Sequence, residues 1–206
     1  MTRRVAAAAI GLALILSACG AKQAEHPPLP VHLLAVLPLQ DGPQVAKGAT
    51  PPEDGAAIVT AQIYRILAEQ TEIRFVPDLT VVDTLTMPEL RAAETQLDTA
   101  VALGKAVGAD AVIIGRVTRF SPRVGTAYGA SAGASVAFEL GIVSVASGEQ
   151  IWNGDFEETQ EALATNFLDI WMFWSTGPRW LTANELAGLG VEKLWPDVTK
   201  QMDAQD

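Results

Sequence analysis

The stretch GASAG, Gly129 to Gly133, has the G-x-S-x-G spacing that places a serine nucleophile on a sharp turn between a strand and a helix. A hydrolase of that kind also needs a histidine later in the chain to accept the serine proton. Both histidines, His26 and His32, precede Ser131, and the residues after Gly133 alternate as a strand does. We therefore interpret GASAG as a loop of small residues that leads into a hairpin.

Two further patterns contain residue types that could do chemistry. Carboxylates gather at Asp155, Glu157, Glu158 and Glu161. They could hold a hard cation, but their spacing does not fit an EF-hand loop, so we interpret them as a solvated edge. Gly188 and Gly190 form a G-x-G pair that lacks the third glycine and the preceding strand of a dinucleotide site. The sequence therefore predicts no metal, no nucleotide cofactor and no enzyme activity.

Cys19 is the only cysteine of the chain, and it lies where an apolar stretch ends. An N-terminal pair of arginines, an apolar segment from Val5 to Leu16, and the small residues Ser17 and Ala18 precede it. This order is that of a secretory signal peptide. The apolar segment is shorter than the roughly 20 residues that a membrane-spanning helix needs, so we predict that it is removed.

The residues Leu16, Ser17, Ala18 and Cys19 resemble the lipobox of bacterial lipoproteins. The resemblance implies that the Cys19 sulfur receives a diacylglycerol, that the chain is cut before it, and that the new amino end is acylated. Two or more acyl chains hold a protein on a membrane, whereas one binds marginally. Gly20 stands where an aspartate would resemble an inner-membrane retention signal, which favours the outer membrane. The alternative is that Cys19 is a small buried residue in an N-terminal helix.

The composition is acidic and has no basic cluster: 206 residues carry a net charge of −10. Nucleic-acid binding needs positive charge against the phosphates, so the charge argues against a nucleic-acid partner and against adhesion to anionic headgroups. The length suits one domain that buries about 70% of its unfolded surface. We predict a signal peptide over 1–18, a proline-rich lipidated tether over 19–30 and a single domain over 31–206.

Strand and helix patterns alternate along that domain. The sequence predicts strands over 31–40, 72–79, 110–120, 134–145 and 150–159, the last two paired as an antiparallel hairpin. Helices are expected to begin at three T-x-x-E capping boxes, Thr50 to Glu53, Thr86 to Glu89 and Thr182 to Glu185. The second helix should end at Gly108, and the third should be interrupted around Pro196. This order predicts a three-layer α/β (α+β) domain on a mixed sheet of about five strands.

Three stretches carry a family resemblance: LLAVLPL at 33–39, ALGKAVGADAVIIGRVTRF at 102–120 and VAFELGIVSVASGEQIWNGDFEET at 136–159. They are similar to the domain shared by penicillin-binding-protein activator lipoproteins of the LpoB type, curli-secretion lipoproteins of the CsgG type and the amino-terminal domain of TolB. The resemblance implies a non-enzymatic accessory protein of the outer membrane that faces the periplasm. Such a protein activates a cell-wall synthase or assists an export or surface-assembly machine.

The resemblance leaves a second function open, a subunit of an oligomeric CsgG-like secretion channel. In that case residues 125–145 would insert as a membrane hairpin. The chain is short for such a channel, so we expect a monomer or small oligomer rather than a ring.

The segment FLDIWMFWSTGPRW, 167–180, carries three of the five tryptophans and is apolar around its whole circumference. Such a segment is core, a partner surface or a membrane-interface element. Tryptophan is frequent at binding hot spots, so we select Trp171, Phe173 and Trp180 as candidate partner-binding residues. Packing beneath the last helix, contact with lipid headgroups and binding of a small ligand or glycan are the alternatives.

Overall fold

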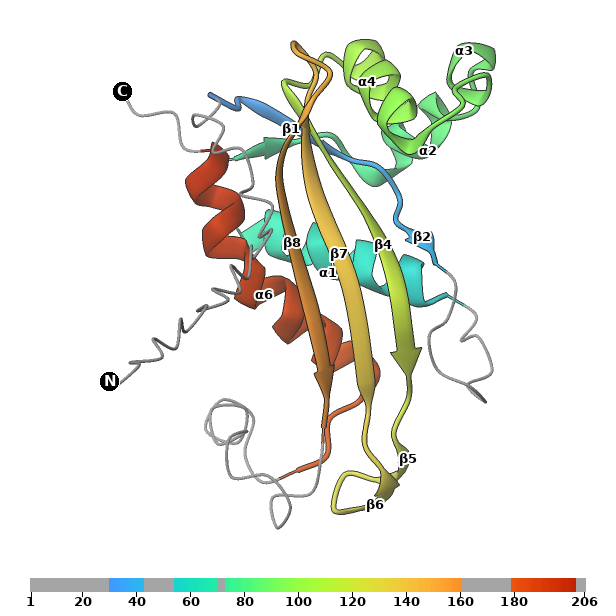
Figure 1. Cartoon of the computed structure of the whole chain (residues 1–206), viewed down its shortest axis with the longest axis vertical. Coiled ribbons are helices and arrows are strands. Elements are labelled where there is room, and N and C mark those ends of the chain that lie inside the picture. Colours follow the sequence, from blue (N-terminus) through green and yellow to red (C-terminus); the bar gives the residue numbers. More distant parts are fainter. Residues whose placement is uncertain (1–29, 43–53, 70–72, 161–178, 203–206) are drawn as a thin grey trace, which may run out of the picture.

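The computed structural model of the chain describes residues 30–42, 54–69, 73–160 and 179–202 (Figure 1). The main sheet has the strand order β3-β1-β4-β7-β8, and β2 also pairs with β4. Its strands are β1 (Leu33–Val36), β2 (Gln40–Asp41), β3 (Arg74–Phe75), β4 (Ala111–Ser121), β7 (Ser135–Ser144) and β8 (Gln150–Thr159). A separate hairpin pairs β5 (Val124–Thr126) with β6 (Gly129–Ala132). The helices are α1 (Gly55–Glu69), α2 (Asp78–Thr84), α3 (Pro88–Arg91), α4 (Gln96–Val107) and α6 (Ala183–Met202).

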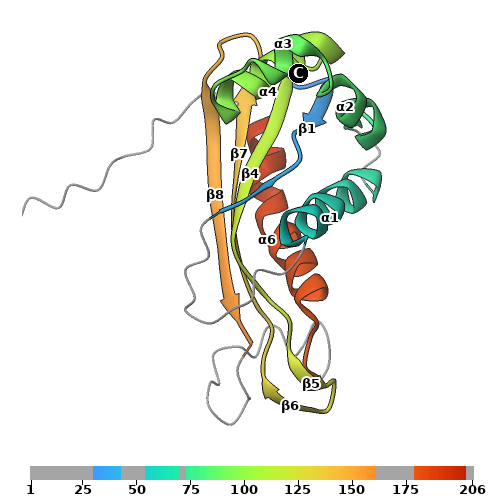
Figure 2. The same ribbon diagram turned by 90° about the vertical axis from the view of Figure 1, so that its right-hand side faces the viewer.

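The sheet is mixed, as predicted. β1 runs parallel to β3 and β4, whereas β7 runs antiparallel to β4 and β8. Helices α1 and α6 cover one face, and α2, α3 and α4 cover the other face at the end where β4 begins (Figures 1 and 2). The α+β fold on a sheet of about five strands is therefore confirmed, with three layers at that end.

The first half of β4 is buried on both faces. Ile113 and Val117 belong to the apolar cluster formed with α1 and α6, and Val112 and Ile114 belong to the cluster formed with α2, α3 and α4. Side chains of a strand point alternately to the two faces, so a strand covered on both faces reads as a continuous apolar run. This packing confirms the strand predicted over 110–120.

β1 is also buried on both faces, but it is shorter than the predicted range 31–40. Leu34 and Val36 face α1 and α6, and Ala35 faces the other cluster. Pro38 follows, and a proline has no N–H to donate to a neighbouring strand. Pairing with β4 therefore stops after β1 and resumes at β2.

A β-bulge in β4 changes which side chains face the core. The register with β7 shifts between Val117 and Arg119, so Thr118 has no directly opposite partner. The extra residue turns Phe120 towards α1 and α6, the same side as Val117, and turns Arg119 to the other face. Without the bulge, Phe120 would point away from the core.

Helix α1 packs on the sheet through one apolar stripe of its surface. Val59, Ile63 and Leu67 are fully buried in the cluster shared with α6. The capping box predicted at 50–53 lies outside the described residues.

The structure corrects two predictions between β1 and α4. The strand predicted over 72–79 is reduced to the two residues of β3, because α2 begins directly after Pro77. The capping box predicted at 86–89 does not form. Instead, the Thr86 hydroxyl donates to the carbonyl oxygen of Asp83 at 2.7 Å, and α3 begins without a side-chain cap.

The single helix predicted up to Gly108 is two helices, α3 and α4. Thr95 starts the second one, since its hydroxyl oxygen accepts the N–H of Asp98 at 3.0 Å. Gly108 ends α4 in the left-handed conformation with φ 71°, as predicted.

The capping box at the start of α6 is confirmed. The Thr182 hydroxyl accepts the N–H of Glu185 at 3.2 Å, and the Glu185 carboxylate accepts the N–H of Thr182 at 2.9 Å. The predicted interruption at Pro196 is wrong, because α6 is continuous through it. A proline inside a helix costs about 3 kcal/mol, which the burial of Trp195 and Val198 on either side offsets.

β7 and β8 form the predicted antiparallel hairpin, with Phe138 opposite Phe156. β7 lies in the middle of the sheet, between β4 and β8, and nearly all its side chains are buried. The range 125–145, considered as a membrane hairpin, thus ends in a core strand.

Gly190 of α6 provides a test of this packing, because a Cβ added there would lie 2.5 Å from Phe156 Cδ1. We expect Gly190→Ala to destabilise the protein by about 1–3 kcal/mol through overpacking, although alanine favours helices by about 1 kcal/mol. Gly188→Ala is the matched control, since its Cβ would meet only the ends of the Gln62 and Arg65 side chains, at 2.9 and 3.3 Å. Thermal unfolding compares the variants, and equal melting temperatures would contradict the close packing.

Candidate partner-binding site

Of the predicted site residues, the structure describes only Trp180. Cys19, Trp171 and Phe173 lie outside the described residues. The side chain of Trp180 is half-buried, and the residue lies just before α6, next to the β5–β6 hairpin. The structure therefore tests the aromatic segment at this one position.

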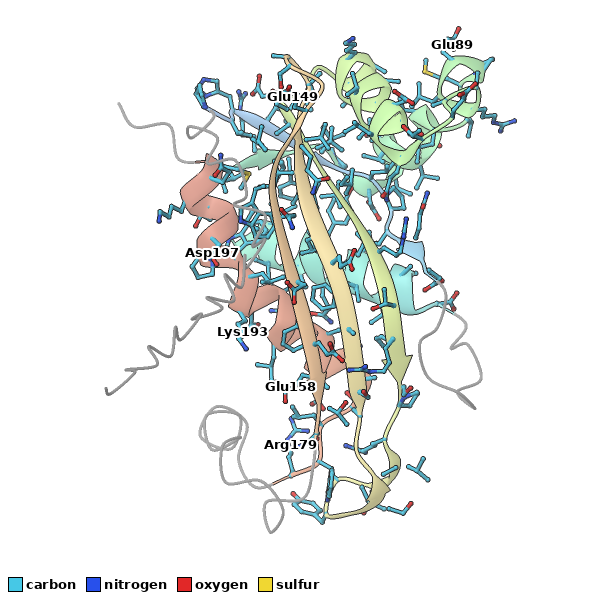
Figure 3. The ribbon with its side chains drawn as sticks, viewed as in Figure 1. Glu89, Glu149, Glu158, Arg179, Lys193 and Asp197 are labelled. Atoms are coloured by element: carbon cyan, nitrogen blue, oxygen red, sulfur yellow. The ribbon has the colours of Figure 1, made fainter. Side chains whose placement is uncertain are left out.

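Trp180 lies in a surface at the end of the sheet farthest from α4, where the β5–β6 hairpin protrudes (Figure 1). We refer to this surface, formed by Arg123, Val124, Tyr128, Arg179 and Trp180, as the hairpin end. Figure 3 shows Arg179 at this end and Glu89 and Glu149 at the opposite one.

The backbone of Trp180 holds the hairpin both at its turn and at its base. Its N–H donates to the carbonyl oxygen of Ala127 at 2.8 Å, and its carbonyl oxygen accepts a hydrogen bond from the Arg123 guanidinium. These contacts join residues more than 50 positions apart. Trp180 is thus a structural anchor of the hairpin as well as a candidate contact residue.

Gln160, directly after β8, binds the backbone on both sides of Trp180. Its side-chain amide donates to the carbonyl oxygen of Arg179 at 3.0 Å and accepts the N–H of Leu181 at 2.6 Å. A Cβ at Gly133 would lie 1.8 Å from the Gln160 carbonyl oxygen and 2.9 Å from the Trp180 ring. Only glycine fits there, because a Cβ would overlap these atoms. The chain between β6 and β7 therefore packs directly against Gln160 and Trp180.

The hairpin presents apolar surface to solvent. Tyr128 in the turn is 86% exposed, and Val124, at the base of the hairpin opposite Ala132, is 59% exposed. Tyrosine is enriched at binding hot spots because it offers a rigid ring and a hydroxyl together. Tyr128 was not among the residues predicted from the sequence; its signal was an isolated aromatic residue in the turn-forming run GTAYGA.

An ion pair connects the hairpin end to α6. The Arg179 guanidinium donates to both carboxylate oxygens of Glu185, at 2.7 and 3.0 Å. This hydrogen bonding, with further help from Thr182, lowers the pKa of Glu185 to about 2. The same pair raises the pKa of Arg179, to which the nearby Tyr128 also contributes. The segment before α6 is therefore held by charge as well as by backbone contacts.

Ser131 is not arranged as a nucleophile. It lies on β6, its hydroxyl donates to the carbonyl oxygen of Val124 at 3.3 Å, and the next element is the strand β7. The strand–turn–helix geometry of a nucleophile elbow is thus replaced by two consecutive strands. GASAG is a hairpin strand, where we had expected a loop.

The predicted acidic group is divided between the two faces of the sheet. Asp155 and Glu157 alternate with Phe156, which faces the core, so their side chains point to the opposite face from Glu158. Glu161 lies outside the described residues. Within the described ranges, no three histidine, cysteine or acidic residues come together in a way that could hold a metal ion. The absence of a metal or cofactor stays a prediction.

No protein-family model matches the chain, and no curated protein matches it in sequence. Several solved structures share its fold. The PelC dodecamer from Paraburkholderia phytofirmans has a TM-score of 0.50 at 14% identity, covering 87% of this chain and 94% of that one.

Two others are lipoprotein GNA1162 from Neisseria meningitidis and the LpoB C-terminal domain from Escherichia coli. Their TM-scores are 0.46 and 0.44, at 19% and 17% identity. The matches cover 70% and 68% of this chain, and 91% of each neighbour. LpoB, which the sequence resemblance named, is thus among the structural neighbours, and at these identities the likeness concerns the fold. Likeness to curli-secretion lipoproteins and TolB stays a prediction.

Glu185→Gln tests the ion pair through its pH dependence. The pKa of Glu185 is lowered from 4.5 to about 2 by folding, so its stabilisation is present above pH 4.5 and is lost as the pH falls towards 2. We expect the variant to melt below the wild type at neutral pH, with the difference narrowing across that window.

Glu89→Gln is the control, because Glu89 is exposed and lies at the opposite end of the molecule. Its difference in melting temperature from the wild type should not change across this pH range. Melting curves collected at several pH values give the comparison. A difference for Glu185→Gln that is the same at every pH would contradict the role of its charge.

Proposed function

We propose that this chain is a lipid-anchored, non-enzymatic accessory protein of the cell envelope, which binds another envelope protein through the hairpin end. The observation that carries the proposal is Tyr128, an almost fully exposed aromatic side chain in a turn that Trp180 holds through the neighbouring Ala127. A preorganised aromatic anchor loses little conformational entropy when it is buried against a partner. Trp171 and Phe173 are proposed as further contacts, since their segment begins and ends beside the hydrogen-bonded pair Gln160 and Arg179.

The placement of the tether supports an anchored role. Pro30 lies beside Asp110, directly before β4, whereas the hairpin end follows the other end of β4. The 11 residues of β4 separate the two by about 35 Å. A 19–30 tether attached through Cys19 spans at most about 40 Å. The extended tether is therefore longer than this separation, so an anchored chain could bring its hairpin end to a partner away from the membrane surface.

The described helices do not provide another means of crossing a membrane, because none is both long and apolar enough. In the proposal the membrane link is therefore the acylated Cys19. We propose the outer membrane, with the domain facing the periplasm, from the residue that follows the cysteine.

A second candidate is a subunit of an oligomeric ring in an export channel. The observation in its favour is that the structural neighbour PelC is a dodecamer. The core position of β7 weighs against insertion of residues 125–145 as one membrane hairpin. Mass photometry of a detergent extract separates the candidates, since a ring gives one discrete large species and an accessory protein gives a monomer or small oligomer.

Cys19→Ser tests the anchor. We expect the variant to lose labelling by radioactive palmitate and to accumulate as an uncleaved precursor or leave the membrane fraction, because the sulfur that carries the lipid is absent. Ser17→Ala, which keeps a small residue before the cysteine, should be labelled as the wild type is. Membrane retention with no lipid label on the wild type would disprove the anchor.

Tyr128→Ala tests the partner surface. An exposed residue changes folding stability by only about 0.5 kcal/mol, while a hot-spot residue contributes about 2 kcal/mol or more to binding. We expect an unchanged melting temperature and about a 30-fold weaker complex. Crosslinking in intact cells, with identification of the captured envelope protein, measures the loss.

Leu79→Ala is the matched control, since Leu79 is a 73% exposed apolar residue on α2 at the other end of the sheet. It should leave crosslinking unchanged. If Leu79→Ala removes the crosslinked product and Tyr128→Ala does not, the binding surface lies on α2 and not at the hairpin end.

A further inference from the structure

β8 is a long edge strand. It has 10 residues, whereas β3 at the other edge of the sheet has two. On its inner side β8 pairs with β7, and no strand in the described part of the chain pairs with its outer side. Natural edges are commonly protected by shortness, proline, charge or bulges. β8 is long and has neither lysine nor proline, and its one register shift, at Ile151, lies near its start, away from Asp155 and Glu157.

A groove lies beside this edge, on the sheet face opposite α1 and α6. Its volume is about 480 Å³, and β4, β7 and β8 form its floor. Gln96 of α4 closes one end, because the helices on this face cover only the start of β4 (Figure 2). None of the described helices thus covers this face along the middle of β8.

The charged side chains that line the groove are basic on β4 and acidic on β7 and β8, so the groove is negative at its β8 edge. Glu139 of β7 lies directly opposite Asp155 of β8, and both are exposed. Glu157 is held at 2.8 Å by Arg119 of β4, and Arg116 of β4 lies directly opposite Glu139, on the side of β7 away from the edge. No ion pair between described residues neutralises Glu139 or Asp155.

Two like charges directly opposite on neighbouring strands destabilise a sheet. Arg116 offsets part of this cost at Glu139, whereas Asp155, at the edge, has no basic residue opposite it among the described residues. A cationic side chain placed next to Asp155 would remove that cost, and a strand added to the edge of β8 brings side chains to within about 5 Å of it.

We propose that the outer edge of β8 binds an extended partner segment with lysine or arginine at alternate positions, which joins the sheet as a further strand. Asp155 and Glu157 are two residues apart on one face, which matches the side-chain repeat of such a segment. The backbone groups of β8 supply hydrogen bonds, and the carboxylates select the basic partner. A second copy of this chain does not fit, because pairing of two β8 edges would set these carboxylates against each other.

This edge is separate from the hairpin end and does not depend on the lipid anchor, so its failure would leave the proposed function unchanged. The test uses the full chain in detergent and a ten-residue synthetic peptide in which lysine alternates with valine and threonine, the length of β8. Two control peptides carry glutamate in place of lysine, or N-methyl groups on the backbone amides that would face β8.

We expect the lysine peptide to bind and to slow hydrogen exchange of the β8 amides, while both control peptides fail to bind. Asp155→Asn should weaken binding about threefold to fivefold, as expected for one cross-strand charge pair, and should raise the melting temperature of the free protein. Asp197→Asn, which removes one exposed charge from α6, should change neither quantity.

Three results would overturn the proposal. The first is that the lysine peptide does not bind even at millimolar concentration. The second is that the glutamate or N-methylated peptide binds equally well, or that Asp155→Asn binds as tightly as the wild type. The third is a concentration-dependent dimer in which the β8 amides are protected without peptide, which would make a second copy the occupant of the edge.

Discussion

The antiparallel pairing of β4 with β7 is the interaction on which the other features of the molecule depend. It extends from Ala111 opposite Ser144 to Ser121 opposite Ser135. β1 and β2 join the sheet through β4, and β8 joins it through β7, so both apolar clusters form around this pair. The β5–β6 hairpin continues the same two strands beyond the helices, which places the hairpin end far from the start of β4 (Figure 1).

The two faces of this sheet are covered unequally, and that difference determines which surfaces are open. α1 and α6 cover one face, with close contacts such as Gly190 against Phe156. On the other face α4 packs tightly at one end, where a Cβ at Gly104 would overlap Val145, and leaves the rest to polar side chains. Arg119 of the bulge organises part of that open face through Ser135 and Glu157. Both proposed contact surfaces therefore lie where none of the described helices covers the strands.

Much of the fold could be predicted from the sequence, because the relevant signals are local. The apolar runs of β4 and β7, the buried stripe of α1 and the capping box of Thr182 and Glu185 each depend on residues close together in the chain. The expected lipid attachment at Cys19 has the same local character, and it stays a prediction together with the contacts of Trp171 and Phe173. For the candidate site, the tryptophan-rich segment 167–180 indicated Trp180, but no pattern in the sequence indicated Tyr128.

The sequence by itself thus determined the fold class, the longer strands and the start and end of several helices. Only the tertiary structure decided the shortness of β3, the bulge at Thr118, the continuity of α6 through Pro196, the exposure of Tyr128 and the facing charges of Glu139 and Asp155. These features arise from contacts between residues far apart in the chain, such as burial against the sheet and cross-strand register. Local propensities are worth at most about 1 kcal/mol per residue outside proline, so burial and pairing of this kind override them.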